Sequence, residues 1–108
     1  MKLIVAIVNY DDAGSVVQNL AKNGFSCTRL STTGGFLLAG NVTLLIGVED
    51  EQVSEAIDVI RQFSHSRRQL VPSFTEMGYG FMPPSIPVEV TVGGATLFVV
   101  DVERFERL

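Results

Sequence analysis

The sequence predicts a mixed α+β domain of ferredoxin-like βαββαβ order, with both helices on one face of the sheet. Strand and helix patterns alternate along the chain, and residues 7–20 repeat in outline at 46–57: an apolar strand end, two acidic residues and an amphipathic helix. The chain has 108 residues, of which 46% are hydrophobic and 19% charged. This is enough for one core, so we expect a single domain over residues 1–108.

The first strand is expected at residues 3–8, which are apolar on both alternating faces. Asp11 and Asp12 follow as expected helix caps, and Asn23-Gly24 ends the helix with Gly24 in the left-handed conformation. The buried face of this helix is expected to contain the apolar residues at helical spacing, which are Ala13, Val16, Val17, Leu20 and Ala21.

The second half of the pattern begins at residues 25–31, where Phe25 and Cys27 share one face of an expected strand. A further apolar strand is expected at 42–48. Glu49 and Asp50 then cap the second helix, with Asp50 as the expected N-cap residue. Its buried face is expected to consist of Val53, Ala56, Ile57, Ile60 and Phe63.

The last part of the chain combines a long loop with paired strands. Residues 68–71 suggest a short extended piece, and 72–87 contain all four prolines, which predicts a long loop after the second helix. Residues 88–92 and 96–102 flank Gly93-Gly94, so we expect a hairpin with a tight turn there.

The strands at 3–8, 42–48 and 96–102 are apolar on both faces, although two helices can cover only one face of a sheet. The other face must therefore be covered, most simply by copies of the same chain. Grooves between such copies would be natural sites for a small ligand.

Charge and composition exclude several kinds of protein. The net charge is -4 with a pI of about 4.8, so a nucleic-acid partner is not expected. The one basic run, 65–68, is interpreted as a solvated helix end or as an anion contact. The apolar run 3–8 is too short to span a membrane, and a single cysteine fits a reducing compartment, so we expect a cytoplasmic protein.

Catalysis has little support in the sequence. Cys27 and His65 are the only candidates for a cysteine–histidine pair, and Cys27 is interpreted as a buried small hydrophobic residue. The acidic pairs are explained by helix capping, and neither a metal-ligand spacing nor a nucleotide-binding glycine motif is present. We therefore expect no enzyme activity, no metal and no cofactor.

The segment from Thr28 to Asn41 is the strongest candidate for a binding site. Its glycines, Gly34 and Gly35, would let backbone N–H groups approach an anion, and Phe36 could stack on a base. Asn41 could pair with an adenine edge. The alternative is an ordinary hairpin with a core phenylalanine.

This segment also carries a family resemblance. The stretch Leu30-Ser-Thr-Thr-Gly-Gly-Phe-Leu-Leu-Ala-Gly-Asn-Val-Thr closely resembles the signature of the PII-like cyclic di-AMP receptors. The similarity runs essentially end to end and includes residues 1–8, 46–50, 67–71 and 87–99. It implies a ferredoxin-like homotrimer that binds one cyclic di-AMP at each subunit interface, reshapes nearby loops, signals to an unknown downstream protein and is not catalytic.

The resemblance also implies roles for individual residues. Thr28 would contact a phosphate or ribose, Phe36 would stack on one adenine, and Asn41 would read an adenine edge. Gly35 and Leu37 would shape the pocket wall, and Gly47 would allow close backbone access. These residues lie at positions that match the family pattern.

Some positions depart from that pattern. Ser26 stands where the family commonly has a ligand-contacting arginine, a loss of roughly 1.5–3 kcal/mol for one charge-assisted hydrogen bond. Gly24 stands in place of asparagine and Arg107 in place of a ligand-contacting glutamine, and residues 76–84 also differ. Arg107 could restore the charge lost at Ser26.

Two other interpretations therefore stay open. The same trimer could bind a different adenine nucleotide, which the serine at position 26 favours. Alternatively, the chain could be a ligand-free interaction module whose long loop docks a partner. Tyr79 and Phe81 in that loop could pack against the sheet edge, form a base-stacking lid, or contact the partner.

Overall fold

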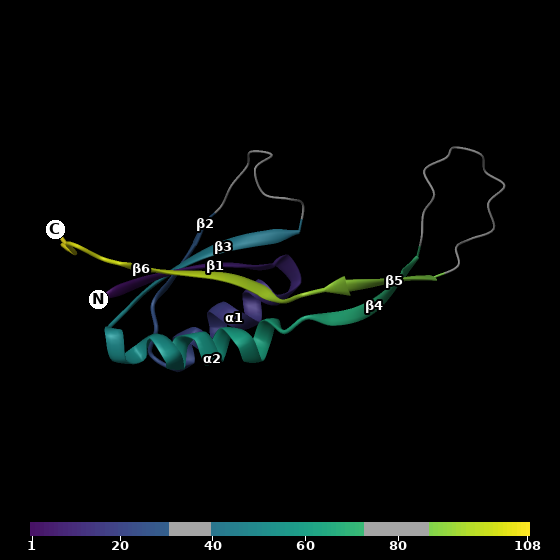
Figure 1. The fold of residues 1–108 in the computed structure, drawn as a ribbon, viewed down its shortest axis with the longest axis horizontal. Helices are drawn as coiled ribbons and strands as arrows, with labels where there is room; N and C mark the ends of the chain where they lie inside the picture. Colours follow the sequence, from purple (N-terminus) through teal and green to yellow (C-terminus); the bar gives the residue numbers. More distant parts are fainter. Residues whose placement is uncertain (31–39, 73–86) are drawn as a thin grey trace.

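A computed structural model describes residues 1–30, 40–72 and 87–108 (Figure 1). The elements in chain order are β1 (Lys2–Asn9), α1 (Tyr10–Lys22), β2 (Cys27–Leu30), β3 (Asn41–Val48), the 3₁₀ turn η1 (Asp50–Gln52), α2 (Val53–Ser64), β4 (Arg67–Pro72), β5 (Pro87–Val92) and β6 (Ala95–Asp101). The expected long loop at 72–87 falls mainly outside the described residues.

Four strands form an antiparallel sheet in the order β2-β3-β1-β6, and both helices lie on one face of it (Figure 1). This mixed α+β arrangement is compatible with the predicted ferredoxin-like fold. The outer pair β4 and β5 forms a separate two-stranded antiparallel sheet that extends away from the helices. We refer to β4 and β5 together as the arm.

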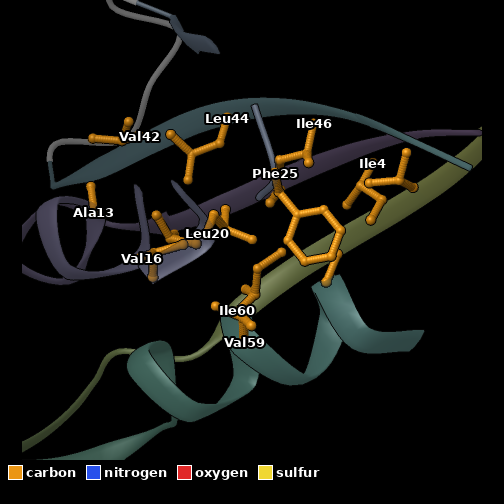
Figure 2. Packing of buried hydrophobic residues seen from close by; sticks show 14 residues of the cluster. Ile4, Ala13, Val16, Leu20, Phe25, Val42, Leu44, Ile46, Val59 and Ile60 are labelled. Carbon is orange, nitrogen blue, oxygen red and sulfur yellow. The ribbon is translucent and has the colours of Figure 1, made fainter. Parts of the chain in front are cut away.

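The core lies between the sheet and the two helices (Figure 2). Alternate residues of β1 and β3 point into it, and α1 and α2 contribute their apolar faces, as the spacing predicts. Val59 is an additional buried residue of α2, and Ala21 is exposed on α1. The fully buried side chains include Ile4, Leu20, Leu44, Ile46 and Ile60.

The predicted hairpin across Gly93-Gly94 is wrong. Strand β5 pairs with β4, whereas β6 pairs with β1, so the two strands that flank the glycines belong to different sheets. Both glycines have positive φ, 82° and 81°, which favours glycine. They redirect the chain from the arm, where β5 pairs with the preceding strand β4, into the main sheet, where β6 pairs with β1.

The predicted helix caps also need correction. Asn9, not Asp11 or Asp12, caps α1 through a 2.9 Å hydrogen bond from the Asp11 N–H to its side-chain oxygen. At the second helix Glu49 takes the capping position before η1, where its N–H donates to the Gln52 side chain, whereas Asp50, the expected N-cap, lies 3.0 Å from the amino terminus. Gly24 does end α1 with φ 84°, as predicted.

Candidate functional site

The sheet face opposite the helices, which we call the open face, holds several predicted ligand residues. On β1 and β3 it carries alternate residues that pair across the strands, with Leu3 opposite Gly47 and Val5 opposite Leu45. The remaining positions on this face are Ile7, Asn9, Asn41, Thr43, Thr28, Leu30, Thr96, Phe98 and Val100. None of these register positions in the four described strands is charged.

Apolar exposure on the open face is concentrated at β6. Phe98 is 54% exposed and Val100 is 45% exposed, and they pair with Val5 and Leu3 of β1. Scattered apolar residues are common on protein surfaces, but these form a continuous group across neighbouring strands. The face therefore has the character of a surface that a further layer covers.

Thr28, Asn41 and Gly47 all occupy this face. Thr28 pairs with Leu45, and Asn41 begins β3 opposite Asn9 at the far end of the sheet. Space is open beside Gly47, where an added Cβ would meet no atom within 4 Å. Ser26 is exposed and immediately precedes β2, whose first residue, Cys27, pairs with Ile46 beside Gly47 on β3.

Other predicted ligand residues are not brought to this face. Gly35, Phe36 and Leu37 lie outside the described residues. Arg107 is exposed in the tail after β6, the edge strand opposite β2, so β3 and β1 separate it from the region of Ser26. Within one chain the structure does not bring Arg107 and Ser26 together.

A small cavity of about 200 Å³ adjoins Asn41 at the far end of the open face. Its lining includes Ile7, Gly93, Gly94 and Thr96, which the sequence did not place in the site. The sequence signal for this part of the site is the Gly93-Gly94 pair, but that pair predicts a hairpin turn by local rules. Because the pair instead joins the arm to β6, it comes close to the start of β3.

The structure also places Cys27 and the basic run at 65–68. Cys27 is half-buried on the helix side of β2, where burial raises the pKa of its thiol, so it is a weak nucleophile. In the basic run, Arg67 is not a solvated helix end, because it pairs with Asp12 on α1. The hydrogen bond from Arg67 to Asp12 raises the pKa of the guanidinium.

The described regions show neither a metal-ligand cluster nor a membrane-spanning helix. Within residues 1–30, 40–72 and 87–108, no three histidine, cysteine or acidic side chains are grouped closely enough to hold a metal ion. Neither of the two described α-helices has the length and apolar character needed to cross a membrane.

Fold and open face together define an α+β domain whose sheet exposes an uncharged, largely apolar surface beside a polar end. The chain belongs to the cyclic-di-AMP receptor family, whose model matches residues 1–108. It is also similar to a solved structure described as a functionally unknown protein from Pediococcus pentosaceus ATCC 25745. That similarity has 39% identity and a TM-score of 0.74, and covers 99% of this chain and 96% of the other.

Proposed function

We propose that the protein is a cytosolic signalling receptor that binds cyclic di-AMP between the subunits of a homotrimer and has no catalytic activity. The observation that carries the proposal is the open face, where Thr28, Asn41 and Gly47 stand on a sheet surface that the chain's own helices leave uncovered. Family membership supports cyclic di-AMP as the ligand.

The assembly follows from the apolar part of that face. Burying apolar area stabilises association by roughly 25 cal/mol per Å², so exposed side chains such as Phe98 and Val100 favour covering the sheet. A second copy of the chain offers the same uncharged surface. Three sheets packed around one axis would place each β2–β3 edge next to a neighbouring subunit and so create three equal grooves.

Each predicted contact has a chemical reason. In the groove, Thr28 would donate to a phosphate or ribose, and the Asn41 carboxamide would read an adenine edge. Gly47 would let the ligand approach the backbone of β3. By family resemblance Gly35, Phe36 and Leu37 would complete the pocket, with Phe36 stacked on a base. Ligand binding would then reposition the loop at 72–87 for a downstream protein.

One observation favours a second ligand. Ser26 is exposed where, by resemblance, the family commonly has a ligand-contacting arginine, so one charge-assisted contact to the ligand would be absent. The same grooves could then prefer another adenine nucleotide that needs fewer cationic contacts. The fold and the assembly are the same in both cases.

Isothermal titration calorimetry with cyclic di-AMP, cyclic di-GMP and ATP would test the proposal. We expect cyclic di-AMP to bind with a stoichiometry of one per subunit. Tighter binding of ATP would favour the second ligand, and no binding of any of the three would support a ligand-free interaction module. Recovery of unchanged cyclic di-AMP after long incubation is expected, and hydrolysis would contradict the absence of catalysis.

Gly47→Val gives a sharper test of where the ligand lies. Because space beside Gly47 is open and its φ is not positive, the fold should accept valine with an unchanged melting temperature. Cyclic di-AMP affinity should fall at least about tenfold, which is about 1.4 kcal/mol. Gly14→Ala is the matched control, since its added Cβ also meets no atom within 4 Å but lies on α1. Equal affinities in both variants would place the ligand elsewhere.

A further inference from the structure

The first turn of α1 contacts a segment at the end of the open face. The backbone N–H of Tyr10, the first residue of α1, donates to the carbonyl of Gly40. Gly40 immediately precedes Asn41, so this hydrogen bond ties the beginning of α1 to the beginning of β3. Asn9 holds the turn itself by accepting from the Asp11 N–H.

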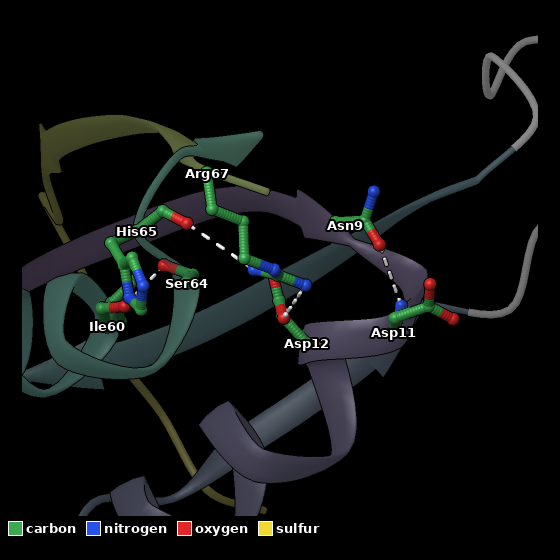
Figure 3. A network of polar contacts seen from close by, with 7 residues as sticks. All are labelled: Asn9, Asp11, Asp12, Ile60, Ser64, His65 and Arg67. Carbon is green, nitrogen blue, oxygen red and sulfur yellow. Dashed lines mark hydrogen bonds and ion pairs between the residues drawn. The ribbon is translucent and has the colours of Figure 1, made fainter. Parts of the chain in front are cut away.

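The same turn also holds the arm. Asp12 is buried, 7% exposed, and its two carboxylate oxygens accept from Nη2 of Arg67 at 3.0 Å and from Nη1 at 3.2 Å (Figure 3). Nη1 of Arg67 donates in addition to the His65 carbonyl at 3.4 Å. Arg67 is the first residue of β4, so this two-pronged contact fixes the point at which the arm begins. A buried carboxylate left without such a partner is costly, so loss of this contact would destabilise the fold.

The chain that leaves β5 also packs against the contact between Arg67 and Asp12. Gly93 follows β5, and a Cβ at this position would lie 2.6 Å from Nη1 of Arg67 and 2.6 Å from the His65 carbonyl oxygen. It would also lie 3.3 Å from a carboxylate oxygen of Asp12. Both strands of the arm therefore meet α1 at one closely packed point, which only glycine permits.

We propose that the first turn of α1 is a mechanical connection between the Asn41 end of the open face and the arm, with Asp12 as its positioning residue. A displacement of Gly40 would be passed through the Tyr10 amide to Asp12, and from Asp12 to Arg67 and both strands of the arm. The direction of the signal, from bound ligand to arm, rests on the proposed function. The existence of the connection does not rest on the proposed function.

The connection can be tested without ligand by amide hydrogen exchange measured by NMR. In Gly93→Ala the new methyl group must push against the backbone carbonyl of His65. We expect the amides of the arm and the Tyr10 amide to exchange at least about tenfold faster than in the wild-type protein. A factor of this size corresponds to the loss of one charge-assisted hydrogen bond. Amides in the centre of β1 should be unchanged.

Gly94→Ala is a matched control. Gly94 has nearly the same φ, 81° against 82°, but its added Cβ would come no closer than 3.7 Å, to the Cβ of Ser66. Both substitutions therefore introduce similar backbone strain, and only Gly93→Ala also brings a Cβ into collision with neighbouring atoms. Similar Tyr10 exchange rates in the two variants, or a change confined to the arm, would overturn the proposal. Asp12→Asn provides an independent variant that removes the charge and keeps the size.

Ligand titration then separates this inference from the proposed function. In the wild-type protein, cyclic di-AMP should alter exchange in the arm. In Asp12→Asn it should bind with affinity within about twofold of wild type, while the arm no longer responds. An arm that still responds would contradict the connection. Failure of the wild type to bind would refute the proposed ligand, and the ligand-free comparison of Gly93→Ala with Gly94→Ala would still decide the connection.

Discussion

Replacing Phe98 with alanine tests whether the open face is buried between subunits. Phe98 is 54% exposed in the single chain, and full burial of a phenylalanine side chain contributes roughly 1.5–3 kcal/mol. Covering the exposed half thus contributes about 1–1.5 kcal/mol per subunit, or about 3–5 kcal/mol per trimer. We expect Phe98→Ala to weaken the assembly by this amount.

The expected shift is measurable. The ratio of trimer to free monomer depends on the square of the free monomer concentration, so this loss displaces the midpoint concentration upward by roughly ten- to seventyfold. Sedimentation velocity across a dilution series would measure the midpoint. Circular dichroism at each concentration would confirm that the variant is folded, because Phe98 also makes contacts within its own chain.

Leu70→Ala is the control for a general loss of surface hydrophobicity. Leu70 is 68% exposed, more than Phe98, but lies on β4 of the arm and not on the open face. It should leave the midpoint unchanged. A wild-type protein that is monomeric at micromolar concentration, or a Phe98→Ala midpoint equal to that of wild type, would refute the argument that this face is an interface.

Three further predictions concern stability and affinity. Ile60→Ala removes a fully buried side chain between α2 and the sheet and should lower the free energy of unfolding in urea by about 2–5 kcal/mol; a loss below about 1 kcal/mol would contradict the core assignment. The hydrogen bond from Lys2 lowers the pKa of Asp101 below 3.8, so this pair stabilises the fold above that pH and loses its effect as pH falls through the lowered pKa. The melting-temperature difference between wild type and Lys2→Met should therefore be constant near neutral pH and vanish in strong acid, and a difference that persists there would exclude this ion pair as its cause. Ser26→Arg should tighten cyclic di-AMP binding by roughly ten- to a hundredfold in calorimetry, whereas Arg107→Ala with an unchanged dissociation constant would remove Arg107 as a substitute cation.

The helical layer was predictable because its signals are local. Ala13, Val16 and Leu20 repeat at helical spacing, and burial follows directly from that periodicity. The apolar runs at 3–8 and 42–48 likewise predicted strands that are apolar on both faces. The resulting expectation of an uncovered sheet face needed only one further fact, that both helices lie on the same side.

The two strands of the arm were predicted at 68–71 and 88–92, but their pairing and their attachment to α1 were not predictable, since these depend on contacts between distant residues. Asp12 and Arg67 are 55 positions apart, and each has an adequate local explanation as a helix cap or a solvated basic residue. Gly93-Gly94 likewise satisfies the local rule for a hairpin turn. Local rules cannot choose between partners for β5, because pairing with β4 or with β6 satisfies the same backbone hydrogen bonds.

In the proposed receptor, the absence of charge on the open face would link ligand binding to assembly. Cyclic di-AMP has two negatively charged phosphates, and the whole chain carries a net charge of -4. The strand positions of the open face in the described ranges supply no cation, so one subunit alone offers mainly neutral donors. A second subunit that contributes backbone N–H groups or an arginine would complete the site, and the ligand should therefore bind the assembled form in preference to the monomer.

Such a preference has a measurable consequence. A ligand that binds only the assembled state stabilises it by roughly 2.7 kcal/mol per site at a hundred times its dissociation constant. Saturating cyclic di-AMP should accordingly lower the midpoint concentration of assembly, and should partly restore assembly in Phe98→Ala. If sedimentation shows the same midpoint with and without bound cyclic di-AMP, each subunit holds a complete site by itself, and the need for a neighbouring chain disappears.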